Sequence, residues 1–466
     1  MNQPVPEVRV EHRGAVGAEG PLLFVRGAPG VGWDEFAEVR LPSGEMRQGL
    51  VLEVHGDLAV IEVMQGTSGI DPATVSTAFS GHPFEVPVGD GWLGRVWDGL
   101  GRPLDGGPPM LGTELRPVTG LPVNPIEREV PREPVITGVS VIDAVTTLVR
   151  GQKLPVFSVA GLPHLELAGQ IASQAHAGGQ PFKVVFVAMG LTSADAATIR
   201  DILESRAAAG DLALFLDTAD DPVVQRVLAP RVALTVAEHL AFDLGQHVLV
   251  VLADMTSYCE ALREVSAARG EVPGRRAYPG YLYSDLASIY ERCGRLKGRP
   301  GSLTQVPVLT MPAGDITHPV ADLTGYITEG QIVLSPGLYG RGLYPPVDVL
   351  DSLSRLMRKG TGAGLTRDDH PRVAAELVAA ESRSRQLLEL VDLIGESALS
   401  PVDRIYLSFH AGFESELVDQ EGGESRPMDE TLDRAWRALS LLPRSELTMV
   451  SEADLDRFYT GADPGG

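Results

Sequence analysis

The 466-residue sequence has few cysteines, a shortage of basic residues and no long apolar run, and each shortage excludes a class of protein. Its two cysteines, Cys259 and Cys293, suit a reducing cytoplasm and cannot build a disulfide framework or a paired-thiolate metal site. Lys and Arg number 39 against 62 Asp and Glu, and the net charge of −23 repels nucleic acid, so no nucleic-acid partner is expected. The longest strongly apolar run, Val248–Ala253, is far shorter than the roughly 20 residues of a membrane helix, so any membrane association must come through partners.

The N-terminus lacks a basic stretch followed by an apolar one, so we expect no signal peptide and a cytoplasmic location. What the sequence does have is the composition of a folded protein, with 44% hydrophobic and 22% charged residues. At roughly 100 to 200 residues per domain, its length favours about three domains.

Short apolar runs such as Leu58–Val63 recur between residues 8 and 70, separated by closely spaced glycines. This pattern predicts short strands that close into a small β-barrel, with an open sheet as the alternative. We place this barrel at residues 1–74. A region rich in Gly and Pro, from Gly81 to Pro134, then connects it to the rest of the chain.

From Leu154 onward, strand-like runs alternate with helical patterns, and Val248–Ala253 followed by Met255–Ala268 is the clearest pair. Such alternation predicts an α/β domain with a parallel sheet covered by helices on both faces, which we place at residues 75–346. Sheets of this kind bind ligands beyond the carboxyl ends of their strands. The loops that follow Val159 and Ala253 are therefore the candidate sites.

After Pro346, helical periodicity replaces the strand pattern, as in Val373–Ile394, and predicts a helical third domain at residues 347–466. Two segments place a hydroxyl three residues before an acid, which is the pattern of a helix N-cap. We therefore expect helices to begin after Thr366 and after Ser400.

The loop after the first central strand has the position of a phosphate-binding loop but not its chemistry. A working loop reads GxxxxGK[ST]: its backbone N–H groups converge on phosphates, the Lys reaches their oxygens and the hydroxyl holds Mg²⁺. In that register the chain has Ser158, Pro163, His164 and Leu165, around Gly161. Proline has no N–H, a neutral histidine is shorter than lysine, and leucine cannot ligate a metal. We therefore expect no tight Mg-ATP binding and no metal site in this loop.

Asp254 directly follows an apolar strand. This is the position of the acid that holds Mg²⁺ in a domain with a working phosphate-binding loop. Its alternative role is to cap the helix that follows, which we favour because the Lys and Thr that would complete a metal site are missing. After the strand Val184–Ala188, the residues Met189-Gly190-Leu191 offer no carboxylate to activate a water molecule. We expect no hydrolytic base there.

Arg355 lies in the segment Leu350–Gly360, with the small polar residues Ser352 and Ser354 before it. A guanidinium is planar and permanently charged, and can stabilise the charge on a transferring phosphoryl group. The alternative is an arginine on a helix surface, held in a salt bridge. The residues alone do not decide between these two roles.

These segments, and others along nearly the whole chain, resemble the non-catalytic B subunit of V-type and A/V-type rotary ATPases or ATP synthases. The resemblance rests on LGRVWDGLGRPLDG (93–106), AGLPH (160–164), ADMTSYCEALRE (253–264), GDITHP (314–319), LTGYITEGQI (323–332), LYPPVDVL (343–350) and SLSRLM (352–357). The combination of Gly-Leu-Pro-His, Asp-Met-Thr and Ser-Leu-Ser-Arg-Leu-Met in this order is the most specific part.

The resemblance implies a P-loop-like central domain of the RecA or rotary ATPase type, in a ring where three such chains alternate with three catalytic A subunits. It implies that Arg355 is an arginine finger that reaches the catalytic site of A, which holds most of the ATP or ADP and Mg²⁺. This chain would then need no cofactor of its own and would not be an ATPase by itself. The alternatives are a purely structural scaffold of the ring and a self-sufficient ring ATPase, which the missing Lys and Ser or Thr disfavour.

The resemblance also implies further partners and site residues. The ring would contact a central rotor stalk and a peripheral stalk on the cytoplasmic side of the membrane, and indirectly a membrane sector that carries protons or sodium ions during ATP synthesis or hydrolysis. The rotor-facing loop would contain Asp315, Thr317 and His318. The residues expected beside the nucleotide at the interface between neighbouring subunits are Tyr339, Arg341 and Tyr344.

Overall fold

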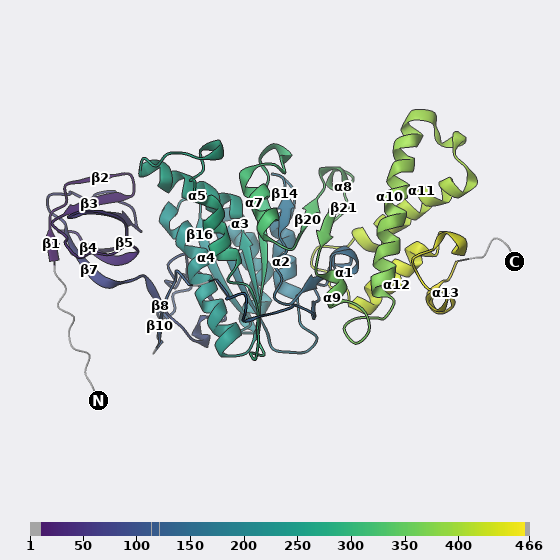
Figure 1. Ribbon diagram of the computed structural model, residues 1–466, viewed down its shortest axis with the longest axis horizontal. Coiled ribbons are helices and arrows are strands. Elements are labelled where there is room, and N and C mark those ends of the chain that lie inside the picture. Colours follow the sequence, from purple (N-terminus) through teal and green to yellow (C-terminus); the bar gives the residue numbers. More distant parts are fainter. Residues whose placement is uncertain (1–10, 113, 121, 462–466) are drawn as a thin grey trace.

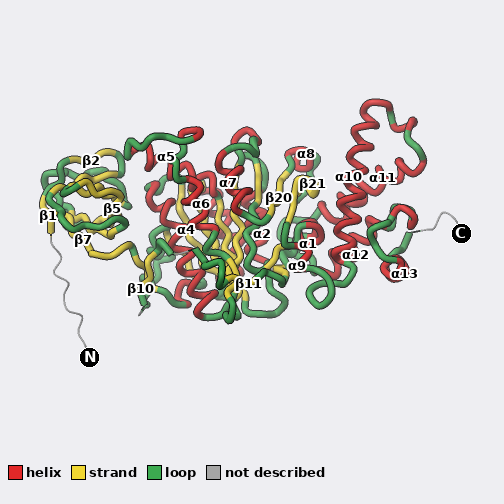
Figure 2. Tube along the Cα trace, in the orientation of Figure 1, coloured by secondary structure: helices red, strands yellow, loops and turns green. Residues whose placement is uncertain are grey.

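The computed structural model describes residues 11–112, 114–120 and 122–461. It has three units in a row, with a β-barrel and a helical unit at opposite ends of an α/β unit (Figure 1). The barrel end consists of strands and loops, and the opposite end of helices and loops (Figure 2). None of the helices in the described residues combines the length and apolarity that a membrane span requires.

The N-terminal sheet is closed into a barrel where its first two strands, β1 and β2, are joined. Its strands are β1 (Glu11–Arg13), β2 (Gly17–Glu19), β3 (Leu22–Arg26), β4 (Glu35–Arg40), β5 (Met46–His55), β6 (Leu58–Val63) and β7 (Ser76–Pro83). They pair in the order β1-β7-β4-β5-β6-β3-β2, so β1 and β2 are the outer strands. The chain joins these two directly, and between them Gly14 donates to the carbonyl of Val75 while Val16 donates to that of Phe24. The predicted barrel is therefore confirmed, and the open sheet is wrong.

The barrel extends beyond the boundary expected after residue 74. Strand β7 pairs with β1 and β4 and so belongs to the barrel sheet. Most of its side chains are only half-buried, and its sequence includes Ser80, Gly81 and Pro83. These residues are typical of turns, so the apolar pattern did not reveal the strand.

The central unit is a largely parallel sheet of ten strands. Its main path runs β21 (Val347–Ser354), β20 (Gly330–Leu334), β14 (Val156–Ser158), β19 (Ser302–Thr310), β17 (His247–Ala253), β15 (Phe182–Leu191), β16 (Leu212–Thr218) and β9 (Arg95–Asp98). Off this path, β18 (Gly294–Leu296) pairs with β19, and β11 (Arg128–Glu129) pairs with β18. Every residue of β17 is buried, which explains its continuous apolar run. Along the main path only β21 runs antiparallel to its neighbour.

Helices cover both faces of this sheet, as the alternating pattern predicted. They are α1 (Ser140–Val145), α2 (His164–Gln174), α3 (Ser193–Ala208), α4 (Val223–Glu238), α5 (Met255–Ala268), α6 (Leu282–Tyr290), α7 (Pro319–Ile327), α8 (Pro336–Gly340) and α9 (Met357–Gly360). Helices α2 and α3 pack in one apolar cluster, and α4 to α7 in another on the opposite face. The short strands β8 (Glu85–Pro87), β10 (Leu115–Pro117), β12 (Pro134–Val135) and β13 (Leu148–Val149) form two small hairpin-like pairs outside the main sheet.

The C-terminal unit is helical, as expected, but it begins later than residue 347. Strand β21 pairs with β20 and so completes the central sheet. The C-terminal half of β21 includes exposed residues such as Asp351 and Leu353, so the strand has no continuous apolar run that would reveal it in the sequence. The helices that follow are α10 (His370–Ile394), α11 (Pro401–Phe413), α12 (Met428–Leu439) and α13 (Glu452–Phe458).

One of the two expected helix starts is confirmed. The Ser400 hydroxyl accepts the backbone N–H of Asp403 and caps α11. The expected cap at Thr366 is wrong, because α10 begins only after Asp369. The Thr366 hydroxyl instead accepts the N–H of Gly362, within the preceding turn.

Candidate functional site

The two loops singled out from the sequence meet at one edge of the central sheet. The carbonyl of Ser158, at the end of β14, accepts the N–H of Met311, just after β19 (2.7 Å). The hydroxyl of Thr310, the last residue of β19, donates to the carboxylate of Asp254, which directly follows β17 (2.6 Å). Because the three strands are parallel, their carboxyl ends lie together, and the loop at 159–163 comes to lie beside Asp254.

Two backbone N–H groups, at the end of this loop and the start of α2, donate to carbonyls of the loop itself. The N–H of Leu162 donates to the carbonyl of Val159 (3.3 Å), and the N–H of His164 donates to that of Leu162 (2.8 Å). The imidazole Nδ1 of His164 lies 2.8 Å from the same Leu162 oxygen. Pro163 has no N–H to offer. A carbonyl oxygen therefore stands at the start of α2, where a phosphate-binding loop would present free N–H donors.

Gly161 and Leu165 lie on either side of Pro163 and His164. Gly161 has φ +87°, a backbone conformation that glycine adopts without strain and that turns the chain toward α2. Leu165 is half-buried and packs against the apolar cluster that includes α2 and α3. A leucine in this place supplies packing and no metal ligand.

Asp254 caps α5. One carboxylate oxygen accepts the N–H of Thr256 (2.6 Å), and the other accepts the hydroxyl of Thr310 (2.6 Å). Burial raises the pKa of Asp254, and the hydrogen bonds from Thr310 and Thr256 offset only part of that rise. The N-cap interpretation is thus confirmed, and both carboxylate oxygens are engaged. Across the described ranges, no group of three or more His, Cys, Asp or Glu side chains could hold a metal ion.

A carboxylate that the sequence did not reveal lies beside Gly190. Asp217, on the neighbouring strand β16, is 1% exposed, accepts the N–H of Gly190 (2.9 Å) and pairs with Arg226 (2.7 Å). Both contacts use the same oxygen, and burial raises the pKa of Asp217 to about 6. The segment Met189–Leu191 itself has no carboxylate, but the neighbouring strand brings one close in space.

Arg355 combines an anchored backbone with a free side chain. Its N–H donates to the carbonyl of Glu329 (3.0 Å), and the hydroxyl of the buried Ser354 accepts from the amide of Gln152 (2.9 Å). The side chain of Arg355 is exposed and, within the part of the chain that the structure describes, forms no hydrogen bond or ion pair. It lies in a turn between β21 and α9, so the alternative of a salt bridge on a helix surface is wrong.

Arg355 lies at the opposite end of the sheet from the chain's own loop at 159–163. Strand β20 is parallel to β14, and the first residue of β20, Gly330, pairs with Ser354, the last residue of β21. Ser354 and Arg355 are therefore at the amino ends of the parallel strands, whereas the loop follows their carboxyl ends. The five residues of β20 therefore separate Arg355 from the end of the sheet at which the loop lies by about 13 Å along the strand direction.

The surface around Arg355 is basic. Arg358 and Lys359, on α9, are also exposed and, like Arg355, have no ion partner among the described residues. In a chain of net charge −23, three unpaired cations within five residues form an unusual surface. Such a surface favours an anionic group that is not part of this chain.

Two of the three residues expected beside an interface nucleotide form contacts within the chain. Tyr339 is 45% exposed, on α8. Arg341 forms a two-pronged ion pair with Glu414, with one nitrogen–oxygen distance of 2.8 Å. Tyr344 donates its hydroxyl to the side-chain oxygen of Gln170, on α2 (2.8 Å), and burial raises its pKa.

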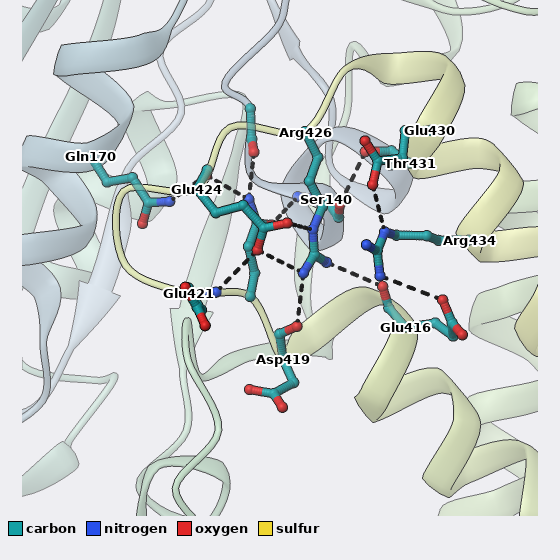
Figure 3. Close-up of polar contacts among 12 residues, drawn as sticks. Ser140, Gln170, Glu416, Asp419, Glu421, Glu424, Arg426, Glu430, Thr431 and Arg434 are labelled. Atoms are coloured by element: carbon teal, nitrogen blue, oxygen red, sulfur yellow. Dashed lines mark hydrogen bonds and ion pairs between the residues drawn. The ribbon is translucent and has the colours of Figure 1, made fainter.

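Gln170 also connects α2 to the C-terminal unit, a contact that sequence reasoning missed. Its amide donates to the carbonyl of Glu424 (3.0 Å), in a segment that the buried guanidinium of Arg426 holds together (Figure 3). Arg426 contacts the Glu424 carboxylate (2.6 Å) and the carbonyls of Glu416 (3.2 Å) and Asp419 (3.1 Å). Gln170 and Glu424 are 254 positions apart, so no local pattern could have paired them.

The three residues of the expected rotor-facing loop lie in one turn after β19. Asp315 accepts the hydroxyl (2.6 Å) and the N–H (2.9 Å) of Thr317 and pairs with Arg276 (2.6 Å), and these contacts lower its pKa to about 2. His318 is buried with its ring edge-on to Tyr278 at 5.6 Å, and burial lowers its pKa. The turn is thus ordered against the loop that precedes α6.

Comparison with protein families divides the chain into the same three units. The model described as "ATP synthase alpha/beta family, beta-barrel domain" matches residues 16–75, and that of the nucleotide-binding domain of the same family matches residues 138–354. The model described as "C-terminal domain of V and A type ATP synthase" matches residues 359–459.

Individual proteins are similar over nearly the whole length. The chain is 52% identical to the B subunit of the A-type ATP synthase of Aeropyrum pernix, over 96% of this chain and 97% of that protein. It is 50% identical to the beta chain of the V-type ATP synthase of Halothermothrix orenii, over 97% and 98%. A solved structure, the ATP synthase subunit NeqB from Nanoarcheaum equitans, superposes with a TM-score of 0.71 at 34% identity, over 90% of this chain and 98% of that one.

Proposed function

Since the chain belongs to the family of A-type and V-type ATP synthase B subunits, we propose that it is the non-catalytic member of a ring that alternates three A and three B subunits. In this proposal Arg355 is an arginine finger that completes the catalytic site of the neighbouring A subunit. The ring would couple ATP synthesis or hydrolysis to proton or sodium transport through a separate membrane sector.

The observation that carries this proposal is the setting of Arg355. Its backbone is hydrogen-bonded to Glu329, its side chain is exposed and unpaired among the described residues, and it lies far from the chain's own loop. An arginine held in this way is available to an anion of another subunit. A permanently charged, planar guanidinium suits the spread charge of a phosphoryl group in transfer.

The division of labour follows from what this chain lacks. The N–H groups of Leu162 and His164 donate to carbonyls of the loop, Pro163 has no N–H, and Asp254 is engaged as a cap. Catalytic A would therefore supply the phosphate-binding loop, the Mg²⁺ ligands and the base. This chain would supply one positive charge, placed where negative charge develops, and the loss of such a finger costs roughly 10³ to 10⁵ in turnover in related chemistry.

Contacts with the rotor, the peripheral stalk and the membrane sector are also part of this proposal. The turn with Asp315, Thr317 and His318 would face the central rotor stalk, and its ordered contacts suit a surface that must keep its shape during rotation. A peripheral stalk would hold the ring still. The ring would sit at the cytoplasmic side of the membrane, attached through its partner subunits.

The test is ATP turnover by a ring assembled from this chain and its cognate A subunit. We expect Arg355→Ala to lower turnover by roughly 10³-fold or more. Arg355→Lys should also be impaired, because an ammonium cannot make the two parallel contacts of a guanidinium. Arg200→Ala is the matched control: it removes an exposed arginine on α3 that has no hydrogen bond or ion pair among the described residues, and it should leave turnover within about twofold of the wild type.

Assembly is checked by native mass spectrometry, so that loss of the ring is not mistaken for loss of the finger. An intact ring with unchanged turnover in Arg355→Ala would leave the chain as a structural scaffold. ATP hydrolysis by this chain without A would instead support a self-sufficient ring ATPase.

A further inference from the structure

Lys153 is a buried cation close to the backbone of Arg355. It is 3% exposed, and its ammonium contacts the carboxylates of Glu329 (2.9 Å) and Glu291 (3.0 Å). A buried ammonium without partners would be strongly unfavourable, so these two carboxylates are needed where they are. Lys153 comes three residues before β14, and its position is therefore set by the central sheet.

Glu329 joins this lysine to Arg355 through every polar group it has. One carboxylate oxygen accepts the backbone N–H of Lys153 (2.8 Å), and the other pairs with the Lys153 ammonium. Its own N–H donates to the carbonyl of Lys153 (3.1 Å), and its carbonyl accepts the N–H of Arg355 (3.0 Å). The position of the Arg355 backbone is therefore tied to the buried lysine through a single residue.

Gln152 supports the same arrangement from the other side. Its side-chain amide donates to the hydroxyl of Ser354 (2.9 Å) and to the carbonyl of Glu329 (3.3 Å). The residue before Arg355 and the residue that binds the Arg355 N–H are thus both held by the segment that leads into β14. The Arg355 side chain has no partner among the described residues. The position from which its guanidinium extends is therefore determined by the backbone alone.

We propose that Glu329, held by Lys153, is a positioning residue for the Arg355 finger. The inference rests on the proposed function, because it assigns Glu329 a role only if Arg355 acts in a neighbouring site. Its physical basis is that a charge must be placed accurately to stabilise a transition state: a displacement of about 1 Å can cost on the order of 10²-fold in rate.

The test compares Glu329→Ala with Glu291→Ala in the assembled ring. Each substitution removes one of the two carboxylates of Lys153, but Glu291 makes no contact with Arg355. We expect Glu329→Ala to lower kcat roughly ten- to a hundredfold with little change in KM for ATP. Glu291→Ala should stay within about twofold. Equal losses in the two variants would overturn the proposal.

The decisive measurement is the double variant with Arg355→Ala. If Glu329 acts through Arg355, adding Glu329→Ala to the ring that already lacks the finger lowers kcat no further. If Glu329→Ala costs the same factor in both backgrounds, it acts through general stability and the proposal is wrong. Should Glu329→Ala fail to assemble, Glu329→Gln, which keeps one acceptor oxygen, is measured in the same cycle.

The outcomes separate this proposal from the proposed function. A collapse of turnover in Arg355→Ala together with wild-type turnover in Glu329→Ala overturns the positioning role and leaves the finger intact. Unchanged turnover in Arg355→Ala overturns both. A loss in Glu329→Ala that disappears in the double variant supports both.

Discussion

The α-carbon of Gly330 lies directly against the carbonyl of Leu353, and a Cβ built on Gly330 would overlap that oxygen. Gly330 has φ +141°, which other residues rarely adopt. The close approach brings the end of β21 against the start of β20, where Gly330 pairs with Ser354. This contact between two backbones is what places Arg355 next to Glu329.

Gly330→Ala should therefore destabilise the chain clearly. The atom that a new Cβ would meet is backbone, not the flexible end of a side chain, so relief requires the two strands to separate. We expect a loss of about 1–3 kcal/mol and a thermal midpoint several degrees lower by differential scanning calorimetry. Gly340→Ala is the control, because a Cβ at Gly340 meets nothing within 4 Å and its midpoint should hardly change. Equal midpoints in the two variants would contradict the steric argument.

The loop at 159–163 should regain phosphate binding if its missing groups are restored. We expect the triple variant Pro163→Gly, His164→Lys and Leu165→Thr to bind Mg-ATP at least about tenfold tighter than the wild-type chain, by isothermal titration calorimetry. The substitutions return an N–H, a long cation and a hydroxyl to the places where a working loop has them. Leu165→Thr alone restores only the hydroxyl and should change the affinity little. Tight binding by the wild-type chain would show that this view of the loop is wrong.

Asp254 should tolerate asparagine but not alanine. An asparagine still accepts the N–H of Thr256 and caps α5, and burial already favours the uncharged form of the aspartate. Alanine removes the acceptor, and its expected cost is about 0.5–2 kcal/mol in urea unfolding. If asparagine were as destabilising as alanine, the negative charge rather than the cap would be what matters at this position.

His410 should make the stability of the C-terminal unit depend on pH. Its imidazole lies 2.9 Å from Glu381 and 3.1 Å from Glu414, and hydrogen bonds to these carboxylates raise its pKa from 6.5 to about 9. The folded chain thus binds the proton more tightly than the unfolded chain. The stability that His410 contributes is fully present below pH 6.5 and is lost as the pH rises to about 9.

The measurement is the thermal midpoint of the wild type and of His410→Gln across this pH range. We expect the wild type to exceed the variant by the most near pH 6 and the difference to shrink steadily toward pH 9. A difference that stays constant over the range would mean that His410 contributes packing and not a charge.

Elements with a strong local pattern could be predicted from the sequence. The buried strand β17 shows as an unbroken apolar run, and α5 begins at the residue after Asp254, as expected. The cap at Ser400 was found because its acid partner, Asp403, lies three residues away. Strands β7 and β21 were missed because neither shows a continuous apolar run: most side chains of β7 are only half-buried, and the C-terminal half of β21 is largely exposed or half-buried.

The residues alone were enough to establish the order of the three units and to show that the lysine and hydroxyl of a working phosphate-binding loop are replaced by His164 and Leu165. Both depend on periodicity or on side-chain identity within a few neighbouring positions. Folding in three dimensions settled that Arg355 is unpaired among the described residues and remote from that loop, and that Glu329 connects its backbone to Lys153. Lys153 and Glu329 are 176 positions apart and meet only because β20 pairs beside β14, and no local pattern in a sequence encodes which distant strands become neighbours.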